Sequence, residues 1–573
     1  MNVSINKKDI IKLLEKIAMY MELKGENPFK TSAFRKAAAA LENDQRSLKE
    51  IDDLTALPGI GKGTAAVIEE YRETGESATL KELQAEVPEG LIPLLRIAGL
   101  GGKKIAKLYK ELHITNKDEL MKACEEKKVS ALAGFGAKSE EKILNALKEV
   151  NDGPDRFPLS FVMPIADQIE TYLGKIDAIK KFSRAGSLRR MKESVKDLDF
   201  IIATDRPEEV REQLLQLPNI KDVIGAGDTK VSITLSYEYD ISIDFRMIKP
   251  EEFYTTLHHF TGSKDHNVRM RQLAKERGEK ISEYGVENAE TGEVLTFPSE
   301  EAFYHHFDLP FIPPQCREDG TEVDYFPADE IVGPDDIKGD IHMHSTWSDG
   351  AYSIEEMIEA CRAKGYSYMA ITDHSQYLKV ANGLTPERLR EQIQLIKEYN
   401  RKYDDIEILA GIEMDILPDG TLDFDDELLK ELDLVIASIH SSFSQDREQI
   451  MKRLKTALDN PNVDIIAHPT GRLIGRRDGY DVDVDLLIQW AKETNTALEL
   501  NANPNRLDLS AEHLKKAQAA GVTIAINTDA HSMEMLEHMP IGVSTAMKAL
   551  LKKETILNTK SADELIAFLK RND

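Results

Sequence analysis

The stretch 185-AGSLRRMKESVKDLDFII-202 decides how the first half of this 573-residue chain is interpreted. Its apolar, strand-like end carries Asp197 and Asp199. Side chains two residues apart on a strand leave the same face of a sheet, so both carboxylates point the same way. A second strand-like run, 242-SIDFRMI-248, places Asp244 on its own polar face. Together the two runs predict a sheet with three carboxylates that converge on one site.

Residues around this stretch suit the binding of a nucleoside triphosphate. Gly186 and Ser187 open a turn that can bind phosphates, and Arg189 and Arg190 follow with positive charge. Three carboxylates can hold two divalent ions about 4 Å apart, one to activate a primer 3′-hydroxyl and one to neutralise the triphosphate. A bare D-x-D pair more often marks a solvated strand edge. Here the Gly-Ser turn precedes the pair and 260-FTGS-263 follows Asp244, which favours the catalytic interpretation.

The second half of the chain is organised around 340-DIHMHSTWSDG-350. This run puts His342 and His344 on one strand face and Asp349 in the loop beyond. Further strand-like runs recur at a spacing that suits strand-plus-helix units and a parallel sheet or barrel. The predicted strands are 339–344, 367–372, 407–413, 434–440, 463–468, 496–501 and 522–529.

Polar residues lie at the ends of these predicted strands. In a (β/α) barrel the carboxyl ends of the strands meet at one mouth, where active sites form. The candidate metal ligands are His342, His344, Asp349, His374, Glu413, His440, His468, Asp529 and His531. A single histidine is more often a structural hydrogen-bonding residue, but six of the chain's 14 would meet at this mouth. Such mixed nitrogen and oxygen ligands suit two or three ions of Zn²⁺, Mn²⁺ or Fe²⁺, able to activate water and clamp a phosphate.

Three arginines follow His468 in the sequence, at Arg472, Arg476 and Arg477. They either bind the phosphates of a substrate backbone or form a solvated surface loop, and the sequence leaves both interpretations open.

Three glycine turns separate short predicted helices in residues 1–150. They read LPGIG at 57–61, AGLG at 98–101 and AGFG at 133–136, and each precedes a helix start that bears lysine. A glycine pair at a helix start lets backbone N–H groups approach a phosphate. One such turn is usually only a helix cap, whereas three copies favour sequence-independent binding of a DNA backbone. The glycines concerned are Gly59, Gly61, Gly99, Gly101, Gly134 and Gly136.

The composition is that of a globular protein and sets few limits on function. The net charge of −27 discourages a nucleic-acid interpretation, but residues 1–150 are almost neutral, with 25 basic and 24 acidic groups. The chain contains no apolar run long enough for a membrane span and begins with no signal peptide, so a cytoplasmic protein without membrane contact is expected. The three cysteines lie far apart, which favours a reducing compartment and argues against a thiolate metal site.

The motifs of residues 1–315 resemble those of family X DNA polymerases, the group that includes DNA polymerase beta. The resemblance implies Asp197, Asp199 and Asp244 as catalytic ligands of Mg²⁺ or Mn²⁺, with gapped or nicked DNA and deoxynucleoside triphosphates as substrates. It further implies nucleotide contacts from Gly186, Ser187, Arg190, Phe260, Gly262 and Asn267. Lys30 and Arg35 match a phosphate-binding side of the N-terminal domain.

Two positions depart from that family pattern. His259 stands where the family often has tyrosine, which leaves discrimination between sugars open. Val67 stands where the beta enzyme carries its lyase lysine, so lyase chemistry at that position is in doubt. Lys62 lies five residues earlier, in the hairpin itself, and could not reach the same point unless the turn moved.

The order H-x-H, Asp, T-D-H, Glu, I-H-S, A-H-P, D-A-H in residues 338–573 is similar to that of the PHP family of phosphoesterases. Every ligand position of the pattern is filled, which implies an active enzyme with a distorted (β/α)7 barrel. The expected fold is therefore multidomain: an α-helical helix-hairpin-helix region, an α+β nucleotidyltransferase palm and thumb, and the barrel.

Six segments are expected: 1–85 helical DNA-binding, 86–150 helix-hairpin-helix, 151–250 palm, 251–315 thumb, 316–338 linker and 339–573 barrel. The linker is expected because that segment is acidic and short of large apolar residues.

The favoured function is short-gap filling by a monomeric DNA polymerase, with a 3′-5′ exonuclease or abasic-site endonuclease in the barrel. Two alternatives remain: a polymerase fused to a small-molecule phosphatase, or a DNA-tethering module joined to a structural barrel.

Overall fold

A computed structural model describes residues 7–43, 51, 53–97, 100–149, 154 and 156–569. The chain forms two compact units. The first combines Met1–Pro154 with the short segments Ser345–Ser353 and His374–Thr385. The second comprises Asp155–His344, Ile354–Asp373 and Pro386–Asp573. In the described part of the chain, no helix has both the length and the apolar character needed to cross a bilayer.

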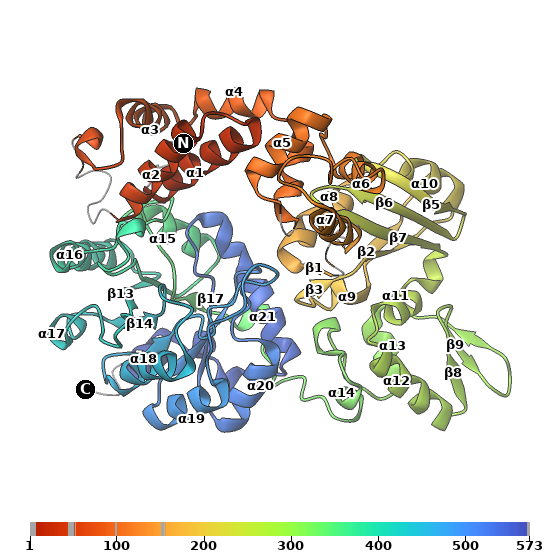
Figure 1. The fold of residues 1–573 in the computed structure, drawn as a ribbon. Helices are drawn as coiled ribbons and strands as arrows, with labels where there is room; N and C mark the ends of the chain where they lie inside the picture. Colours follow the sequence, from red (N-terminus) through yellow and green to blue (C-terminus); the bar gives the residue numbers. More distant parts are fainter. Residues whose placement is uncertain are drawn as a thin grey trace. The chain divides into compact units, whose positions relative to one another are not determined.

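The N-terminal residues of the first unit form short helices around one apolar core (Figure 1). The longer helices are α1 (Lys7–Lys24), α2 (Pro28–Asn43), α3 (Lys62–Thr74), α4 (Ala78–Glu86), α5 (Gly102–Leu112), α6 (Lys117–Glu125) and α7 (Ala137–Glu149). In α1 the residues Ile10, Leu14 and Ile17 recur at helical spacing and are fully buried. Ser77 and Asn116 cap the starts of α4 and α6, because their side chains accept hydrogen bonds from backbone N–H groups.

A mixed sheet of five strands begins the second unit. Its order is β2 (Lys181–Arg184), β4 (Leu198–Ala203), β7 (Asp240–Ile248), β6 (Lys230–Ser236) and β5 (Ile220–Ala226). Helices α8 (Leu159–Leu173) and α10 (Pro207–Leu214) bury one face of the sheet against Phe200 and Phe245. Asp199 therefore points to the other face, because strand neighbours alternate. The short strands β1 (Phe157–Pro158) and β3 (Ser194–Val195) pair beside the sheet.

A helical region follows the sheet and includes a small hairpin-like sheet. Its elements are α11 (Phe253–Thr261), α12 (Lys264–Glu276), β8 (Glu279–Ile281), β9 (Val286–Asn288), β10 (Val294–Leu295), α13 (Glu300–His306) and α14 (Thr321–Asp324). Its centre is polar: Arg317 is fully buried, pairs with Glu300 at 2.9 Å and donates to the Ile312 carbonyl at 2.8 Å.

The segment 316–338 differs from the expected linker. Cys316, Arg317, Glu322 and Val323 are all buried, and α14 lies within the segment. A scarcity of large apolar residues predicted loose chain, but here buried charged and hydrogen-bonded groups hold the segment in place. The six boundaries expected from the sequence remain a proposal.

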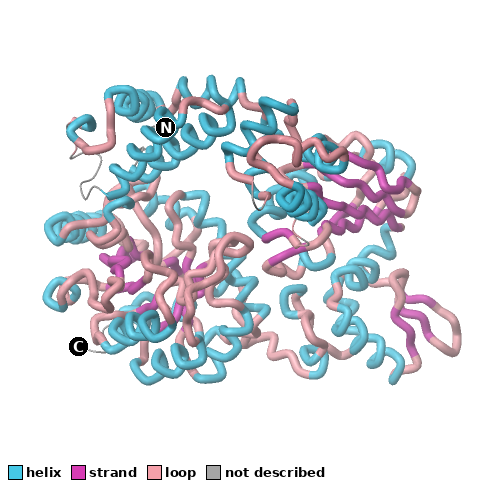
Figure 2. Tube along the Cα trace, in the orientation of Figure 1, coloured by secondary structure: helices cyan, strands magenta, loops and turns pink. Residues whose placement is uncertain are grey.

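The remainder of the second unit is an almost closed parallel barrel (Figure 2). Its strands follow chain order: β11 (Gly339–Asp340), β12 (Tyr368–Ile371), β13 (Glu407–Asp415), β14 (Leu434–Ser438), β15 (Ile465–Ile466), β16 (Ala497–Asn501) and β17 (Ile524–Asn527). A bridge between Met343 and Ala530 links the chain beyond the first strand to that beyond the last. The seven predicted strands and the barrel are thus confirmed.

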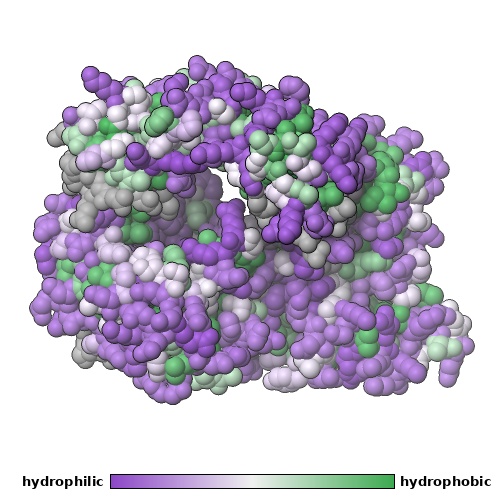
Figure 3. Space-filling model, viewed as in Figure 1, coloured by the Kyte–Doolittle hydropathy of each residue, from purple (hydrophilic) through white to green (hydrophobic). Residues whose placement is uncertain are grey.

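Helices cover the outside of the barrel strands. They are α15 (Ile354–Ala363), α16 (Pro386–Lys402), α17 (Asp426–Leu429), α18 (Arg447–Asp459), α19 (Val484–Thr494), α20 (Ala511–Ala520), α21 (Met539–Lys548) and α22 (Ala562–Leu569). Because both faces of the sheet are covered, every residue of β12 and β14 is buried, which accounts for their continuous apolar sequences. The face drawn in Figure 3 is largely hydrophilic by contrast.

We predict that Glu300→Gln lowers the free energy of unfolding by about 3 kcal/mol, because it leaves the buried Arg317 guanidinium without its anionic partner. Burial opposes ionisation of Glu300, but Arg317 and Arg189 outweigh it and lower its pKa. The contribution is therefore complete above the unfolded pKa of about 4.3 and is lost as the pH falls through the folded value.

Urea unfolding at pH 7 and at pH 3.5 measures both effects, and the difference between wild type and variant should shrink at the lower pH. Asp405→Asn is the matched control, because it removes an exposed partner of Arg362 and should change stability by less than about 1 kcal/mol. Equal small effects of the two substitutions would contradict the prediction.

Candidate active sites

The sheet of the second unit brings its carboxylates together. Asp199 of β4 lies directly opposite Asp244 of β7 in the parallel register, and Asp197 immediately precedes β4. Asp197 is exposed, whereas Asp199 is half-buried. Burial raises the pKa of Asp199 to about 6, and the negative charges of Asp197 and Asp244 act in the same direction.

Basic and hydroxyl groups surround Asp244. Lys230 Nζ lies 2.7 Å from one carboxylate oxygen, and Ser232 donates to the other at 2.6 Å. Burial would raise the pKa of Asp244, but these contacts outweigh it and lower the pKa. The three aspartates thus offer oxygen ligands around one half-buried carboxyl group whose pKa is raised. Divalent cations prefer such oxygen donors, so the residues fit the expected ions.

Gly186 begins α9 (Gly186–Arg189) directly against this cluster. Its φ angle is +60°, and a Cβ atom at this position would lie 2.5 Å from Asp199 Oδ2. Both the backbone conformation and the close approach require glycine. Ser187 follows as a half-buried residue in the same turn.

The two arginines of this turn differ in their surroundings. Arg189 pairs with Glu300 and donates to Thr261 Oγ1 at 2.8 Å, so its charge is already compensated. Our expectation that it supplies charge to a triphosphate is therefore wrong, because a buried carboxylate holds it. Arg190 donates to the Thr261 carbonyl, and within the described residues its buried Nε atom has no hydrogen-bond partner.

The expected nucleotide contacts Phe260, Gly262 and Asn267 lie where α11 ends and α12 begins. Arg246 stacks on the Phe260 ring with its guanidinium 3.9 Å from the ring centre. Asn267 donates to the His259 carbonyl at 2.7 Å. A Cβ atom on Gly262 would lie 3.1 Å from Arg190, so the turn and this arginine pack closely.

The barrel forms a second cluster from strand ends that are distant in the sequence. Four buried residues, His342, His344, Glu413 and Asp529, offer ligand atoms that all lie within 4.8 Å of one another. His344 Nε2 lies 3.2 Å from Asp529 and 3.5 Å from Glu413. Buried imidazole and carboxylate groups at this spacing match the ligand chemistry of Zn²⁺, Mn²⁺ or Fe²⁺.

Three further expected ligands adjoin this cluster. His440 and His468 lie 3.1 Å and 3.0 Å from Glu413 Oε1. The His531 ring stacks on His344 with centroids 4.1 Å apart. Burial opposes protonation of His440, but Glu413 and Asp415 raise its pKa to about 10. Burial likewise opposes the charged forms of His342 and Asp529, but neighbouring groups of opposite charge raise the pKa of His342 and lower that of Asp529.

Asp349 and His374 lie in the two segments that group with the first unit. His374 Nε2 is 3.4 Å from Asp349 Oδ1, so these two expected ligands lie close to each other. Their membership of one cluster with the other seven ligands remains a proposal.

A second layer of polar residues orients the ligands, and the sequence analysis missed it. Glu499 binds His342 Nδ1 at 2.6 Å and accepts from the His468 N–H at 2.7 Å. Asp415 contacts His440 at 3.3 Å. Both carboxylates stand within buried apolar strands, and that unusual placement was the available signal. Arg506 approaches Asp529 at 3.8 Å.

The three arginines after His468 have different environments. Arg472 pairs with Glu193 at 2.8 Å and donates to the Arg506 carbonyl, so it is engaged within the protein. Arg477 covers the Phe443 ring at 4.2 Å, and Arg476 is exposed. Neither of the two original interpretations therefore describes all three residues.

The glycine turns of the first unit are alike where the structure describes them. Gly59 and Gly134 have φ angles of +111° and +89°, and Gly61, Gly101 and Gly136 directly precede α3, α5 and α7. Among described residues, nothing lies within 4 Å of a Cβ built on Gly61, Gly101 or Gly136, so their backbone is open to approach. Gly99 lies outside the described residues.

The other expected DNA contacts of this unit are exposed cations. Lys30 and Arg35 extend from α2 and pair with Glu26 and Glu22. Val67 is buried in the apolar core of the unit, only 8% exposed.

These observations define a class: a nucleotidyltransferase-like carboxylate site joined to a barrel with a cluster of metal-ligand residues. Four family models match the chain: "Helix-hairpin-helix domain" at residues 5–77, "SAM-like Helix-hairpin-helix tandem" at 91–149, "DNA polymerase beta thumb" at 256–318 and "PHP domain" at 340–503.

Two relatives extend the comparison. The chain is 65% identical over 570 residues to the DNA polymerase/3′-5′ exonuclease PolX of Bacillus subtilis (strain 168), covering 99% of this chain and all of that protein. A probable phosphatase of Thermoanaerobacter sp. (strain X514) is 31% identical over 231 residues, which is 38% of this chain and 89% of the relative. The chain therefore belongs to the PolX family of DNA polymerase/3′-5′ exonucleases.

We predict that Gly186→Ala lowers the rate of nucleotide addition about 100-fold, because the new methyl group must displace the Asp199 carboxylate. Single-nucleotide extension on gapped DNA measures the change. Gly225→Ala in β5 of the same sheet is the control, since a Cβ there meets no described atom within 4 Å. Extension by Gly186→Ala within twofold of wild type would refute this role for the turn.

Proposed function

We propose that the chain fills short gaps in DNA from the β4–β7 carboxylate site and removes 3′-terminal nucleotides at the barrel cluster. The observation that carries this proposal is the presence of two separate ligand clusters in a chain that matches a DNA polymerase/3′-5′ exonuclease over its full length. The glycine turns and the adjoining cations would hold gapped or nicked DNA by its phosphates. We further propose that the enzyme acts as a monomer, in the cytoplasm and in base excision repair.

In the first site, Asp197, Asp199 and Asp244 would hold Mg²⁺ or Mn²⁺. The Gly186–Ser187 turn and Arg190 would bind the triphosphate, supported by the close approach of this turn to the aspartate cluster and by the packing of Arg190 against the Gly262 turn. Phe260, Gly262 and Asn267 would line the space for the sugar and base.

In the barrel, His342, His344, Glu413, His440, His468, Asp529 and His531 would hold two or three divalent ions. Asp349 and His374 would complete the set, which is supported by their chain positions: each follows a barrel strand that ends in this cluster. Ions bound at the two sites would supply Lewis acidity toward a phosphoryl oxygen and activate the attacking group. Glu499 and Asp415 would keep the imidazoles oriented and Arg506 would attract the phosphate.

The two sites should be separable by substitution. Asp244→Ala should reduce nucleotide addition at least about 100-fold and leave 3′-end digestion within twofold of wild type. His344→Ala should reduce 3′-end digestion to the same extent and spare nucleotide addition. Each substitution removes a proposed metal ligand from one cluster only. Extension and Mn²⁺-stimulated digestion of a 3′-recessed duplex measure the two activities.

Asp222→Ala and Asp419→Ala serve as controls, since both remove exposed carboxylates that lie outside the two clusters. A phosphomonoester assayed in parallel tests the alternative of a small-molecule phosphatase. Faster turnover of the monoester than of the DNA end would favour that alternative, and loss of both DNA activities from one folded variant would overturn the division.

Cleavage at abasic sites, if catalysed, should be hydrolytic and come from the barrel. A lyase needs a partly desolvated amine, and the corresponding position here is the buried Val67. We therefore expect incision to stop in EDTA and in His344→Ala, and to leave a 3′-hydroxyl. Borohydride trapping on abasic DNA followed by peptide mapping tests this, and an adduct within residues 57–75 that forms in EDTA would disprove it.

A further inference from the structure

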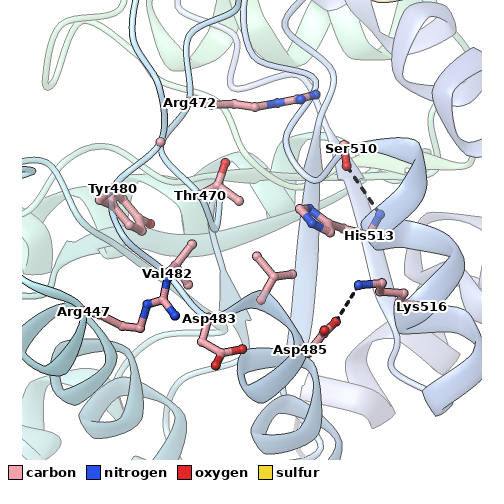
Figure 4. Close-up of a pocket in the computed structure, with 12 residues that line it drawn as sticks. Arg447, Thr470, Arg472, Tyr480, Val482, Asp483, Asp485, Ser510, His513 and Lys516 are labelled. Carbon is pink, nitrogen blue, oxygen red and sulfur yellow. Dashed lines mark hydrogen bonds and ion pairs between the residues drawn. The ribbon is translucent and has the colours of Figure 1, made fainter.

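A polar pocket of about 450 Å³ opens in the barrel beside α19 and α20 (Figure 4). Its lining includes Thr470 and Tyr480 from the loop after β15, Ser510 and His513 at the start of α20, and the cations Arg447 and Lys516. The volume lies within the range of pockets that hold small ligands.

The pocket lies on the catalytic face of the barrel. Helices α19 and α20 follow β15 and β16, so their N-termini stand at the carboxyl ends of these strands. The metal-ligand residue His468 lies at the start of the loop that follows β15, two residues before Thr470. Asp508 fixes this part of the loop by accepting from the Thr470 and Gly471 N–H groups at 3.0 Å and 2.9 Å.

Three polar atoms of the lining have no partner among the described residues: Tyr480 Oη, Thr470 Oγ1 and His513 Nδ1. Tyr480 is 5% exposed and Thr470 is 8% exposed, so water reaches neither hydroxyl freely. Burying a polar group without a hydrogen bond costs free energy, and native structures seldom retain several such groups together without a use. The three atoms are therefore placed to be satisfied by a ligand.

The Tyr480 hydroxyl is held in position by a rigid stack. The Phe443 ring lies parallel to Tyr480 with centroids 6.1 Å apart and an interplanar angle of 7°, and Arg477 covers the Phe443 ring. A hydroxyl on an immobilised ring loses little entropy when it binds, which favours recognition.

Exposed cations stand among the residues that line the pocket. Arg447 pairs with Asp481 at 2.7 Å and Lys516 with Asp485 at 2.9 Å, and all four side chains are largely exposed. Exposed pairs of this kind are weak, so a phosphate can take the place of the carboxylates. The pocket lining thus combines buried hydrogen-bonding groups with three cations and with the carboxylates of Asp483 and Asp485.

We propose that this pocket binds one nucleoside monophosphate unit of a DNA strand engaged at the barrel. Tyr480, Thr470 and His513 contact its base and sugar, and Arg447 and Lys516 contact its phosphate. An apolar ligand would leave the hydroxyls unsatisfied, and an inorganic phosphate would offer no base or sugar to the buried wall. This inference rests on the proposed 3′-end digestion at the barrel and names a subsite for its substrate.

The test uses Tyr480→Phe and Thr470→Val in the full chain, since each removes one hydroxyl and keeps the shape. We expect the KM for digestion of a 3′-recessed duplex to rise about threefold to tenfold, the loss of one hydrogen bond, with kcat unchanged. Calorimetry with thymidine 5′-monophosphate, and with a phosphorothioate-ended oligonucleotide that resists cleavage, should show the same loss of affinity. Thymidine 5′-monophosphate measures the affinity for a free nucleotide, and the oligonucleotide measures the affinity for a DNA strand.

Thermal stability separates a ligand role from a structural one. Because the hydroxyls have no partner in the described structure, removing them should leave Tm unchanged or raise it, whereas a structural hydrogen bond would lower it. Tyr399→Phe on α16 is the matched control and should alter neither KM nor affinity.

Unchanged KM and unchanged binding of both probes in both variants would overturn the subsite. The proposed function would then still stand if His344→Ala abolishes digestion. If His344→Ala instead leaves digestion intact, the proposed function fails, while the calorimetry still decides whether the pocket binds nucleotide.

Discussion

The buried ammonium group of Lys548 connects the two catalytic halves of the second unit. It donates to the Arg190 carbonyl at 2.8 Å and pairs with Glu318 at 2.7 Å, and burial lowers its pKa. A helix of the barrel therefore anchors the very turn that carries the expected triphosphate contact. The pair between Arg472 and Glu193 forms a second anchor, from the loop after His468 to the end of that turn. These charged contacts and the packing of Leu507 and Ile541 into the apolar core of the sheet join the sheet and the barrel within one compact unit.

The carboxylates of the two ligand clusters have different neighbours. In the sheet, burial raises the pKa of Asp199, and the neighbouring carboxylates act in the same direction. In the barrel, carboxylates alternate with imidazoles, so the pKa of Asp529 falls while that of His440 rises to about 10. In the barrel cluster imidazoles lie between the carboxylates, whereas in the sheet cluster Lys230 lies against Asp244 and Asp199 has no cation in hydrogen-bond contact among the described residues. This difference follows from the choice of histidine rather than aspartate at the strand ends.

Much of the fold was predictable because strand periodicity and glycine turns are local signals. The seven barrel strands and the opposed carboxylates of β4 and β7 appear where the spacing placed them. The packing of 316–323 was not predictable, since Arg317 is buried only by virtue of Glu300 and the Ile312 carbonyl, and Glu300 lies 17 residues away. Arg189 was misassigned for the same reason: its partner Glu300 is 111 residues distant in sequence. Long-range ion pairs leave no periodic pattern.

Buried polar groups of this protein fall into two kinds with different meaning. Glu499 contacts His342 and accepts a hydrogen bond from the His468 N–H, and Asp508 accepts one from the Thr470 N–H. Both carboxylates therefore hold neighbouring residues of the barrel in position. Tyr480 Oη, Arg190 Nε and Asn267 Oδ1 have no hydrogen-bond partner within the described part of the chain, although Arg190 Nε lies 4.0 Å from a Glu318 oxygen. Folding alone selects against unsatisfied groups, because each one lowers stability. Which buried side chains have a hydrogen-bond partner depends on contacts between distant parts of the chain, so this division could not be predicted from the sequence.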